Sequence, residues 1–126
     1  MIVLVVDDER DIEMLFQQKF RREIKEGKFA FKFVLSGEEA LKFLEGYGAT
    51  ELVLILSDIN MPGMTGMELL KRIKEKYGKQ KVFLVTAYGD EHSYQQAIDA
   101  GADGFVIKPI DFDDLKTKMY LALGIS

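Results

Sequence analysis

The stretch KVFLVTAYGD, residues 81–90, combines a short apolar run with an abrupt change to polar and turn-forming residues. The run VFLV is continuously apolar, which is typical of a strand that is covered on both faces of its sheet. Thr86 and Ala87 end the run, and Tyr-Gly-Asp follows. Alone, the stretch predicts only that a buried strand ends here, so its meaning depends on how the other strands of the chain end.

Four similar apolar runs, rich in β-branched residues, predict further strands at residues 2–6, 31–35, 52–56 and 105–107. The segments between them have apolar residues at helical spacing and predict five helices, near residues 12–27, 36–46, 65–78, 91–100 and 111–124. Strands that alternate with helices favour a parallel sheet with right-handed crossovers. The predicted fold class is therefore α/β, an open doubly wound sheet of five parallel strands with five helices.

The length, net charge and cysteine content of the chain limit the class of protein to which it can belong. A chain of 126 residues with a formal net charge of -4 and no cysteine is expected to form one domain over residues 1–126. The acidic charge argues against a whole-domain surface for nucleic acid or an anionic membrane. No apolar run is long enough to span a bilayer, and the first residues lack the basic region of a secretory signal. We therefore expect a cytoplasmic protein without membrane contact.

Polar side chains follow four of the five predicted strands, at the point where each strand ends. They are Asp7-Asp8-Glu9, Ser57-Asp58, Thr86-Ala87 and Lys108-Pro109. In open α/β sheets, sites form beyond the carboxyl ends of the strands, so these groups are expected at one edge. Each group alone has a structural explanation, such as an acid at a helix start or a hydroxyl in a turn. Their combination predicts a functional site.

The chemistry of these residues favours phosphoryl transfer. Clustered carboxylates repel one another, and Mg²⁺, which prefers oxygen ligands, would relieve that repulsion. Lys108 can add a positive charge from the opposite side, and the hydroxyl of Thr86 can donate a hydrogen bond. One carboxylate could then act as nucleophile toward a phosphoryl group whose charge these groups stabilise. The residues thus fit the formation of an aspartyl phosphate.

Four motifs, VVDDE, SDINMPGMTG, VTAYGD and GFVIKP, resemble those of the receiver domain of response regulators in two-component signalling. They stand in the family's order, and the resemblance covers essentially the whole chain. The resemblance implies a flavodoxin-like sheet with strand order 2-1-3-4-5, in which the first and third strands are neighbours. Asp7 and Asp8 would then lie beside Asp58.

The resemblance also implies a role for each site residue. Asp58 is expected to be the phosphoacceptor, and Mg²⁺ would be held by Asp7, Asp8, Asp58 and the backbone carbonyl of Asn60. Thr86 would hydrogen-bond the phosphoryl group and Lys108 would pair with it, preceding a cis bond to Pro109. The phosphoryl donor would be a sensor histidine kinase or a histidine phosphotransfer protein.

A switch is the next implication of the resemblance. Thr86 would move toward the phosphoryl group and Phe105 would turn inward, which alters a surface formed by residues 91–100, 105–107 and 111–124. Phe105 lacks the hydroxyl of the commoner tyrosine, so an ordinary core phenylalanine is the alternative. The hypothesis for Tyr88 is that it shields the phosphoryl group from hydrolysis. The surface would control an output domain or effector protein of unknown identity, and direct nucleic-acid binding by this domain is not expected.

Two other functions use similar residues. A haloacid-dehalogenase-like phosphatase also has a strand-end aspartate and Mg²⁺, but it needs a second aspartate where this chain has Asn60. A degenerate receiver that serves only as a scaffold would lack part of the set, whereas Asp7, Asp8, Asp58, Thr86 and Lys108 are all present. The sequence therefore predicts a signalling domain, not an enzyme, whose only catalysis is its own Mg²⁺-dependent phosphorylation and dephosphorylation.

Overall fold

A computed structural model describes residues 1–47, 52–87, 89 and 91–125. Within this part of the chain, a single sheet contains the strands β1 (Ile2–Val6), β2 (Ala30–Val34), β3 (Leu52–Asp58), β4 (Val82–Thr86) and β5 (Gly104–Ile107). The strands pair in parallel in the order β2-β1-β3-β4-β5. The predicted parallel sheet and its strand order are confirmed.

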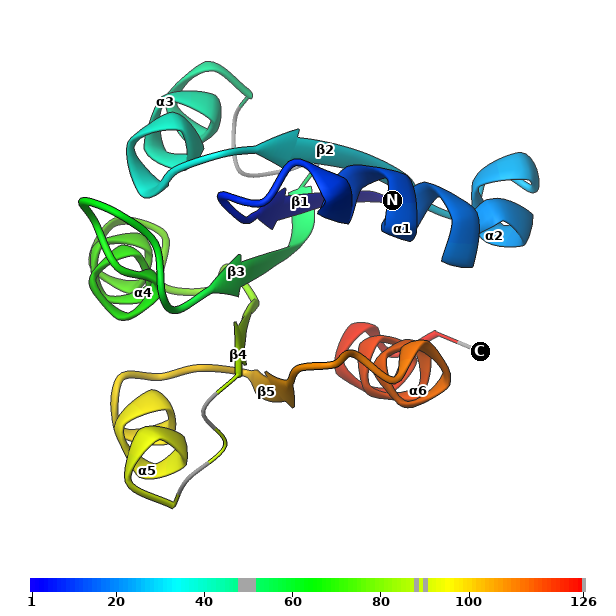
Figure 1. Cartoon of the computed structure of the whole chain (residues 1–126). Coiled ribbons are helices and arrows are strands. Elements are labelled where there is room, and N and C mark those ends of the chain that lie inside the picture. The colour runs from blue at the N-terminus through cyan, green and yellow to red at the C-terminus, as the bar shows by residue number, and fades with distance from the viewer. Residues whose placement is uncertain (48–51, 88, 90, 126) are drawn as a thin grey trace.

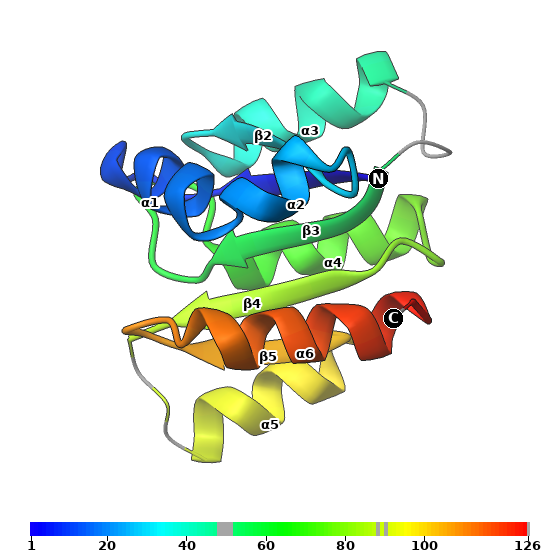
Figure 2. The same ribbon diagram turned by 90° about the vertical axis from the view of Figure 1, so that its right-hand side faces the viewer.

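Helices cover both faces of the sheet, as its continuously apolar strands require. One face carries α1 (Asp11–Lys19), α2 (Arg21–Lys25) and α6 (Phe112–Leu123), and the other carries α3 (Gly37–Tyr47), α4 (Gly66–Lys76) and α5 (Glu91–Asp99) (Figure 1). In Figure 2, α1, α2 and α6 lie in front of the sheet and the strands point in one direction. The doubly wound α/β fold class is therefore confirmed.

The helix count differs from the prediction at Phe20. The apolar pattern predicts one helix near residues 12–27, but Phe20 adopts φ -103° and ψ 19° and separates α1 from α2. Its amide still donates to the carbonyl of Phe16 at 2.9 Å, and its own carbonyl accepts from Ile24 at 2.9 Å. The Phe20 ring is fully buried, with its centroid 4.8 Å from that of Phe31. We attribute the break to the packing of this ring, which no local pattern in the sequence indicates.

The two faces of the sheet have cores of different composition. On the face of α1 and α6, the core is rich in phenylalanine; the rings of Phe16 and Phe112, for example, meet edge to face at 5.2 Å. On the face of α3, α4 and α5, the buried side chains are almost all aliphatic, including Leu69, Leu70 and Ile73. Among the helices in the described residues, none has the length and apolar character needed to cross a membrane.

A polar contact closes the amino-terminal edge of the sheet. Lys74, near the end of α4, donates to the carbonyl of Gln80 at 2.6 Å and to the carboxylate of Asp103 at 2.8 Å. The same carboxylate oxygen of Asp103 accepts from the amide of Val82 at 2.8 Å. These bonds join the starts of β4 and β5 to α4. They lie at the edge opposite to the carboxyl ends of the strands, where the candidate site is found.

Candidate functional site

Three carboxylates meet at the carboxyl edge of the sheet. Asp58 is the last residue of β3, and Asp7 follows the last residue of the neighbouring strand β1. One carboxylate oxygen from each of Asp7, Asp8 and Asp58 lies within 4.8 Å of the others. Asp7 and Asp58 are only 4% and 6% exposed, whereas Asp8 faces solvent. The sequence-predicted acids thus form one cluster that could hold a cation, with one side open.

Local hydrogen bonds fix the orientation of Asp7. Its backbone amide donates to the carbonyl of Val34 at 3.1 Å, which extends the pairing of β1 with β2 by one residue. Its Oδ1 accepts from the amide of Glu9 at 2.9 Å, in the turn that leads into α1. The other oxygen, Oδ2, is 3.2 Å from the Nζ of Lys108. Asp7 is therefore held by two backbone segments and one cation.

Lys108 brings a positive charge to the cluster from the end of β5. Its Nζ lies 3.2 Å from Asp7, 3.4 Å from Asp58 and 3.9 Å from a carboxylate oxygen of Glu9. Its backbone amide donates to the carbonyl of Thr86 at 2.7 Å, and its peptide bond to Pro109 is cis. The ammonium group therefore lies between acids that come from two different strands.

These contacts change the protonation equilibria of the cluster. Burial raises the pKa of Asp58 and the charge of Asp7 raises it further, while Lys108 partly opposes both effects. For Lys108, burial lowers the pKa, but the negative charges of Asp7 and Asp58 outweigh it and the net shift is upward. Lys108 is thus firmly protonated, and one positive charge does not fully offset the crowded acids. This imbalance favours a further cation.

Thr86 lies beside the acids at the same edge. It is the last residue of β4, and its neighbour Val85 is the register partner of Asp58 across the sheet. The amide of Ile59 donates to the carbonyl of Val85 at 2.9 Å, which continues that pairing one residue past Asp58. Thr86 is 1% exposed. A hydroxyl therefore ends the buried strand next to the carboxylate cluster, as the sequence predicts.

The other predicted residues lie around this centre. Asn60 is exposed in the loop after β3, and its backbone amide donates to the Asp58 carboxylate. Phe105 is half-buried on β5, and its ring meets that of Tyr94. Tyr88 lies outside the described residues. Sequence reasoning gave no role to Glu9, whose carboxylate approaches Lys108; the third acid of the Asp-Asp-Glu run was the available signal.

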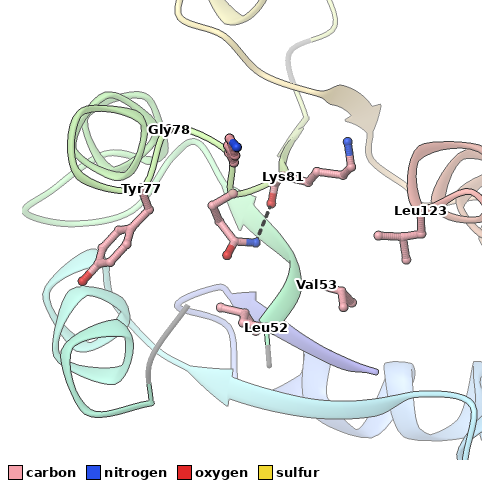
Figure 3. A pocket seen from close by; sticks show the side chains of 8 residues that line it. Leu52, Val53, Tyr77, Gly78, Lys81 and Leu123 are labelled. Atoms are coloured by element: carbon pink, nitrogen blue, oxygen red, sulfur yellow. Dashed lines mark hydrogen bonds between the residues drawn. The ribbon is translucent and has the colours of Figure 1, made fainter. Parts of the chain in front are cut away.

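A hollow of about 470 Å³ opens at the opposite edge of the sheet (Figure 3). It is lined by Leu52, Val53, Tyr77, Gly78, Lys79, Gln80, Lys81 and Leu123. The side-chain amide of Gln80 donates to the carbonyl of Lys81 at 3.2 Å. No carboxylate is among these lining residues of the described chain. The hollow therefore lacks the metal-binding and nucleophilic groups that the carboxyl edge brings together.

Comparison with known proteins agrees with this geometry. The family model of the response regulator receiver domain matches residues 3–120. Sporulation initiation phosphotransferase F of Bacillus subtilis is 31% identical to the chain over 129 aligned residues, which cover 96% of this chain and 94% of that protein. A cyclic di-GMP phosphodiesterase of Thermotoga maritima is 33% identical over 123 residues, 98% of this chain but only 31% of the phosphodiesterase. The chain thus spans about a third of that relative.

The solved structures of similar chains have the same fold. Response regulator protein TrrA from Thermotoga maritima, in complex with Mg(2+)-BeF, is 36% identical with a TM-score of 0.78. The alignment covers 97% of this chain and 98% of TrrA. A response regulator receiver domain protein from Methanospirillum hungatei is 28% identical with a TM-score of 0.84, over 98% of this chain and 93% of that one. The similarity therefore extends over nearly the whole length of the chain.

Proposed function

Because this chain belongs to the family of response regulator receiver domains, we propose that it is a phosphoacceptor whose Asp58 is phosphorylated with the help of Mg²⁺. One observation carries the proposal. Asp58 shares a cluster of carboxylates within 4.8 Å with Asp7 and Asp8, and the ammonium of Lys108 lies 3.4 Å from its Oδ2. A nucleophile, a cation site and a charge for the transferred group thus occur together. In this proposal, residues 1–126 act as one receiver domain.

The donor set fits a magnesium ion. Three carboxylates supply hard oxygen ligands, one of them open to solvent, and Mg²⁺ in proteins keeps several waters beside a few such ligands. We assign Asp7, Asp8, Asp58 and the backbone carbonyl of Asn60 as the ligands. When bound, the ion would offset the negative charge of the carboxylates and of the incoming phosphoryl oxygens.

The residues of the chain have distinct parts in the transfer. A carboxylate oxygen of Asp58 forms the new bond to phosphorus as the phosphorus–nitrogen bond of a donor phosphohistidine breaks, and the histidine nitrogen keeps the bonding electron pair. The Lys108 ammonium pairs with the transferred group, and the Thr86 hydroxyl hydrogen-bonds to it. Hydrolysis later breaks the bond between phosphorus and Asp58. The domain catalyses only these reactions of its own carboxylate.

The proposed switch uses the surface of α5, β5 and α6, which correspond to the predicted elements at residues 91–100, 105–107 and 111–124. Thr86 pairs with Ile107 across β4 and β5, so a movement of Thr86 is transmitted directly to the strand that carries Phe105. The proposed donor is a sensor histidine kinase or a histidine phosphotransfer protein in the cytoplasm. The proposed target of the altered surface is an output domain or a separate effector protein.

Intact mass measurement after incubation with acetyl phosphate tests the proposal. The wild type should gain one phosphoryl group only when Mg²⁺ is present. Asp58→Asn should gain none, whereas Asp11→Asn, which removes an exposed acid from the first turn of α1, should behave as wild type. An adduct that persists in Asp58→Asn would assign the acceptor elsewhere. No adduct in rapidly quenched wild-type samples would favour a receiver that serves only as a scaffold.

A further inference from the structure

The first residue of α4 packs directly on the backbone of Asp58. A Cβ atom added to Gly66 would overlap the carbonyl oxygen of Asp58, and it would lie 2.8 Å from the Asp58 carbonyl carbon and from the Cα of Ile59. All three are backbone atoms, which cannot rotate away as the end of a flexible side chain can. Position 66 therefore has room for hydrogen alone as long as the peptide between Asp58 and Ile59 stays in place.

The same peptide is held by hydrogen bonds from other directions. The amide of Ile59 donates to the carbonyl of Val85 at 2.9 Å, and in the peptide that follows, the carbonyl of Ile59 accepts from the amide of Gly66 at 2.8 Å. The hydroxyl of Ser57, which is fully buried, donates to the carbonyl of Asp58 at 3.0 Å. We call the contacts of Ser57 and Gly66 with the Asp58–Ile59 peptide the backbone seat. It fixes the main chain at the proposed nucleophile.

The start of α4 is also held in place, by an N-cap hydrogen bond and by buried side chains. The hydroxyl of Thr65 accepts from the amide of Glu68 at 3.2 Å and caps the helix. Leu69 and Leu70, in the first turns of the helix, are fully buried in the aliphatic core. Because the interior is closely packed, a methyl group at position 66 has to displace the Asp58–Ile59 peptide, the start of α4 or both.

We propose that Gly66 and Ser57 are positioning residues that set the place of the Asp58 carboxylate, an inference that rests on the proposed function. Phosphoryl transfer requires the nucleophile to meet phosphorus in line, and small displacements of reacting groups cost large factors in rate. In the chain, Asn60, a proposed metal ligand, directly follows the Asp58–Ile59 peptide. Displacement of the peptide would therefore disturb both the nucleophile and one oxygen of the Mg²⁺ site.

The alternative is that Gly66 serves only stability. In that case Gly66→Ala would lower the free energy of unfolding, but each folded molecule would bind Mg²⁺ and react with acetyl phosphate as the wild type does. A positioning role predicts that both properties change in the folded protein. Mg²⁺ affinity and the rate per folded molecule therefore distinguish the two.

The experiment compares wild type, Gly66→Ala, Ser57→Ala and Gly46→Ala. Gly46 lies within α3, where an added Cβ meets nothing within 4 Å, so it is a matched control for a glycine-to-alanine change in a helix. Circular dichroism gives the folded fraction, calorimetric titration gives the Mg²⁺ affinity, and rapid quenching gives the rate with acetyl phosphate at saturating Mg²⁺. Gly66→Ala should lose about 10- to 100-fold in rate per folded molecule and bind Mg²⁺ more weakly. Ser57→Ala should show a smaller loss of both, and Gly46→Ala none.

Each outcome decides a different point. Folded Gly66→Ala with wild-type rate and Mg²⁺ affinity would overturn the inference while leaving the proposed function intact. If Gly66→Ala does not fold, Ser57→Ala tests the inference in its place. An unchanged rate with acetyl phosphate and an unchanged Mg²⁺ affinity in Ser57→Ala would rule out a role for the backbone seat. A wild type that takes up no phosphoryl group would overturn the proposed function, and the inference with it.

Discussion

The rings of Tyr94 and Phe105 meet edge to face, with centroids 5.6 Å apart and ring planes at 86°. Phe105 is half-buried on β5, three residues before Lys108, whereas Tyr94 is 49% exposed on α5. Edge-to-face contact is one of the two preferred geometries of an aromatic pair. Any rotation of Phe105 toward the interior would break this contact. Such a rotation would therefore change the surroundings of the Tyr94 ring on the surface.

The ring resonances of Tyr94 should therefore shift when the domain is phosphorylated. NMR spectra recorded before and after addition of Mg²⁺ and acetyl phosphate would measure the shift. It should be absent in Phe105→Leu, which lacks the ring, and in Asp58→Asn. Tyr77 is the control, since it lies at the carboxyl end of α4 and outside the proposed switch surface of α5, β5 and α6. Equal shifts of both tyrosines would contradict a switch that passes through Phe105.

Asp58→Asn should stabilise the protein at neutral pH. Burial and the charge of Asp7 raise the pKa of Asp58 above its ordinary value of 3.8. Such an acid holds its proton more tightly when folded, so its contribution to the free energy of unfolding is fully present below pH 3.8 and is lost as the pH rises through the raised pKa. Asparagine cannot ionise, so the substitution should raise the free energy of unfolding at neutral pH.

Urea unfolding without Mg²⁺, repeated at several pH values, would measure this gain. It should shrink toward zero as the pH falls to 3.8 and below, where the wild-type carboxyl is also neutral. Asp11→Asn, which changes an exposed acid, should show no comparable pH-dependent gain. A constant difference between Asp58→Asn and wild type over the whole pH range would mean that ionisation of Asp58 is not its cause.

Lys108→Met should bind Mg²⁺ more tightly but accept phosphoryl groups more slowly. The Lys108 ammonium lies 3.2 Å from Asp7 and 3.4 Å from Asp58, so it competes with a cation for the same carboxylates. Removing that charge should tighten Mg²⁺ binding by about 3- to 10-fold, measured by calorimetric titration. Lys116→Met, which removes a lysine paired with Glu23 at 3.1 Å, is the control and should leave Mg²⁺ affinity unchanged. Weaker binding by Lys108→Met would refute this competition.

Asp103→Ala should destabilise the fold without altering the site. It removes the acceptor for the amide of Val82 and the partner of Lys74, both at 2.8 Å, and leaves two donors to find other partners. The expected loss in free energy of unfolding is about 1–3 kcal/mol. Glu26→Ala, which removes an exposed ion pair with Arg22, should cost less than about 1 kcal/mol. The rate per folded molecule with acetyl phosphate should stay at the wild-type value, because Asp103 lies at the amino-terminal edge.

The alternation of apolar runs and helical patterns was enough to predict the fold class, because parallel βα units have few ways to pack. The strand order was expected only from the resemblance to receiver domains. Strand bounds were less accurate: the run at residues 52–56 continues as β3 to Asp58, since its polar end still pairs with β4. The apolar pattern also continued through Phe20, where the structure divides the helix. Pairing and ring packing are tertiary effects that a local pattern does not contain.

The predicted acids, hydroxyl and lysine were brought to one edge because each directly follows or ends a parallel strand. Contacts that depend on the folding of distant segments were not foreseen. The approach of Glu9 to Lys108 joins residues 99 positions apart, and the sequence pattern placed Gly66 only within the helix predicted near residues 65–78. In the structure, the absence of a side chain at Gly66 matters more than its place in the helix, because an added Cβ atom would overlap the backbone of Asp58.

The two faces of the sheet hold their helices by contacts of different kinds. The ring of Phe16 meets those of Phe31, Phe33 and Phe112 at 60°, 71° and 81°, and the energy of such pairs depends on ring orientation. The aliphatic contacts beneath α3, α4 and α5 are non-directional. We therefore expect a small sliding motion of α1 or α6 to disturb several rings at once, and a similar motion of α5 to cost less. On this expectation, Tyr94 and Phe105 belong to the half of the molecule that deforms more easily.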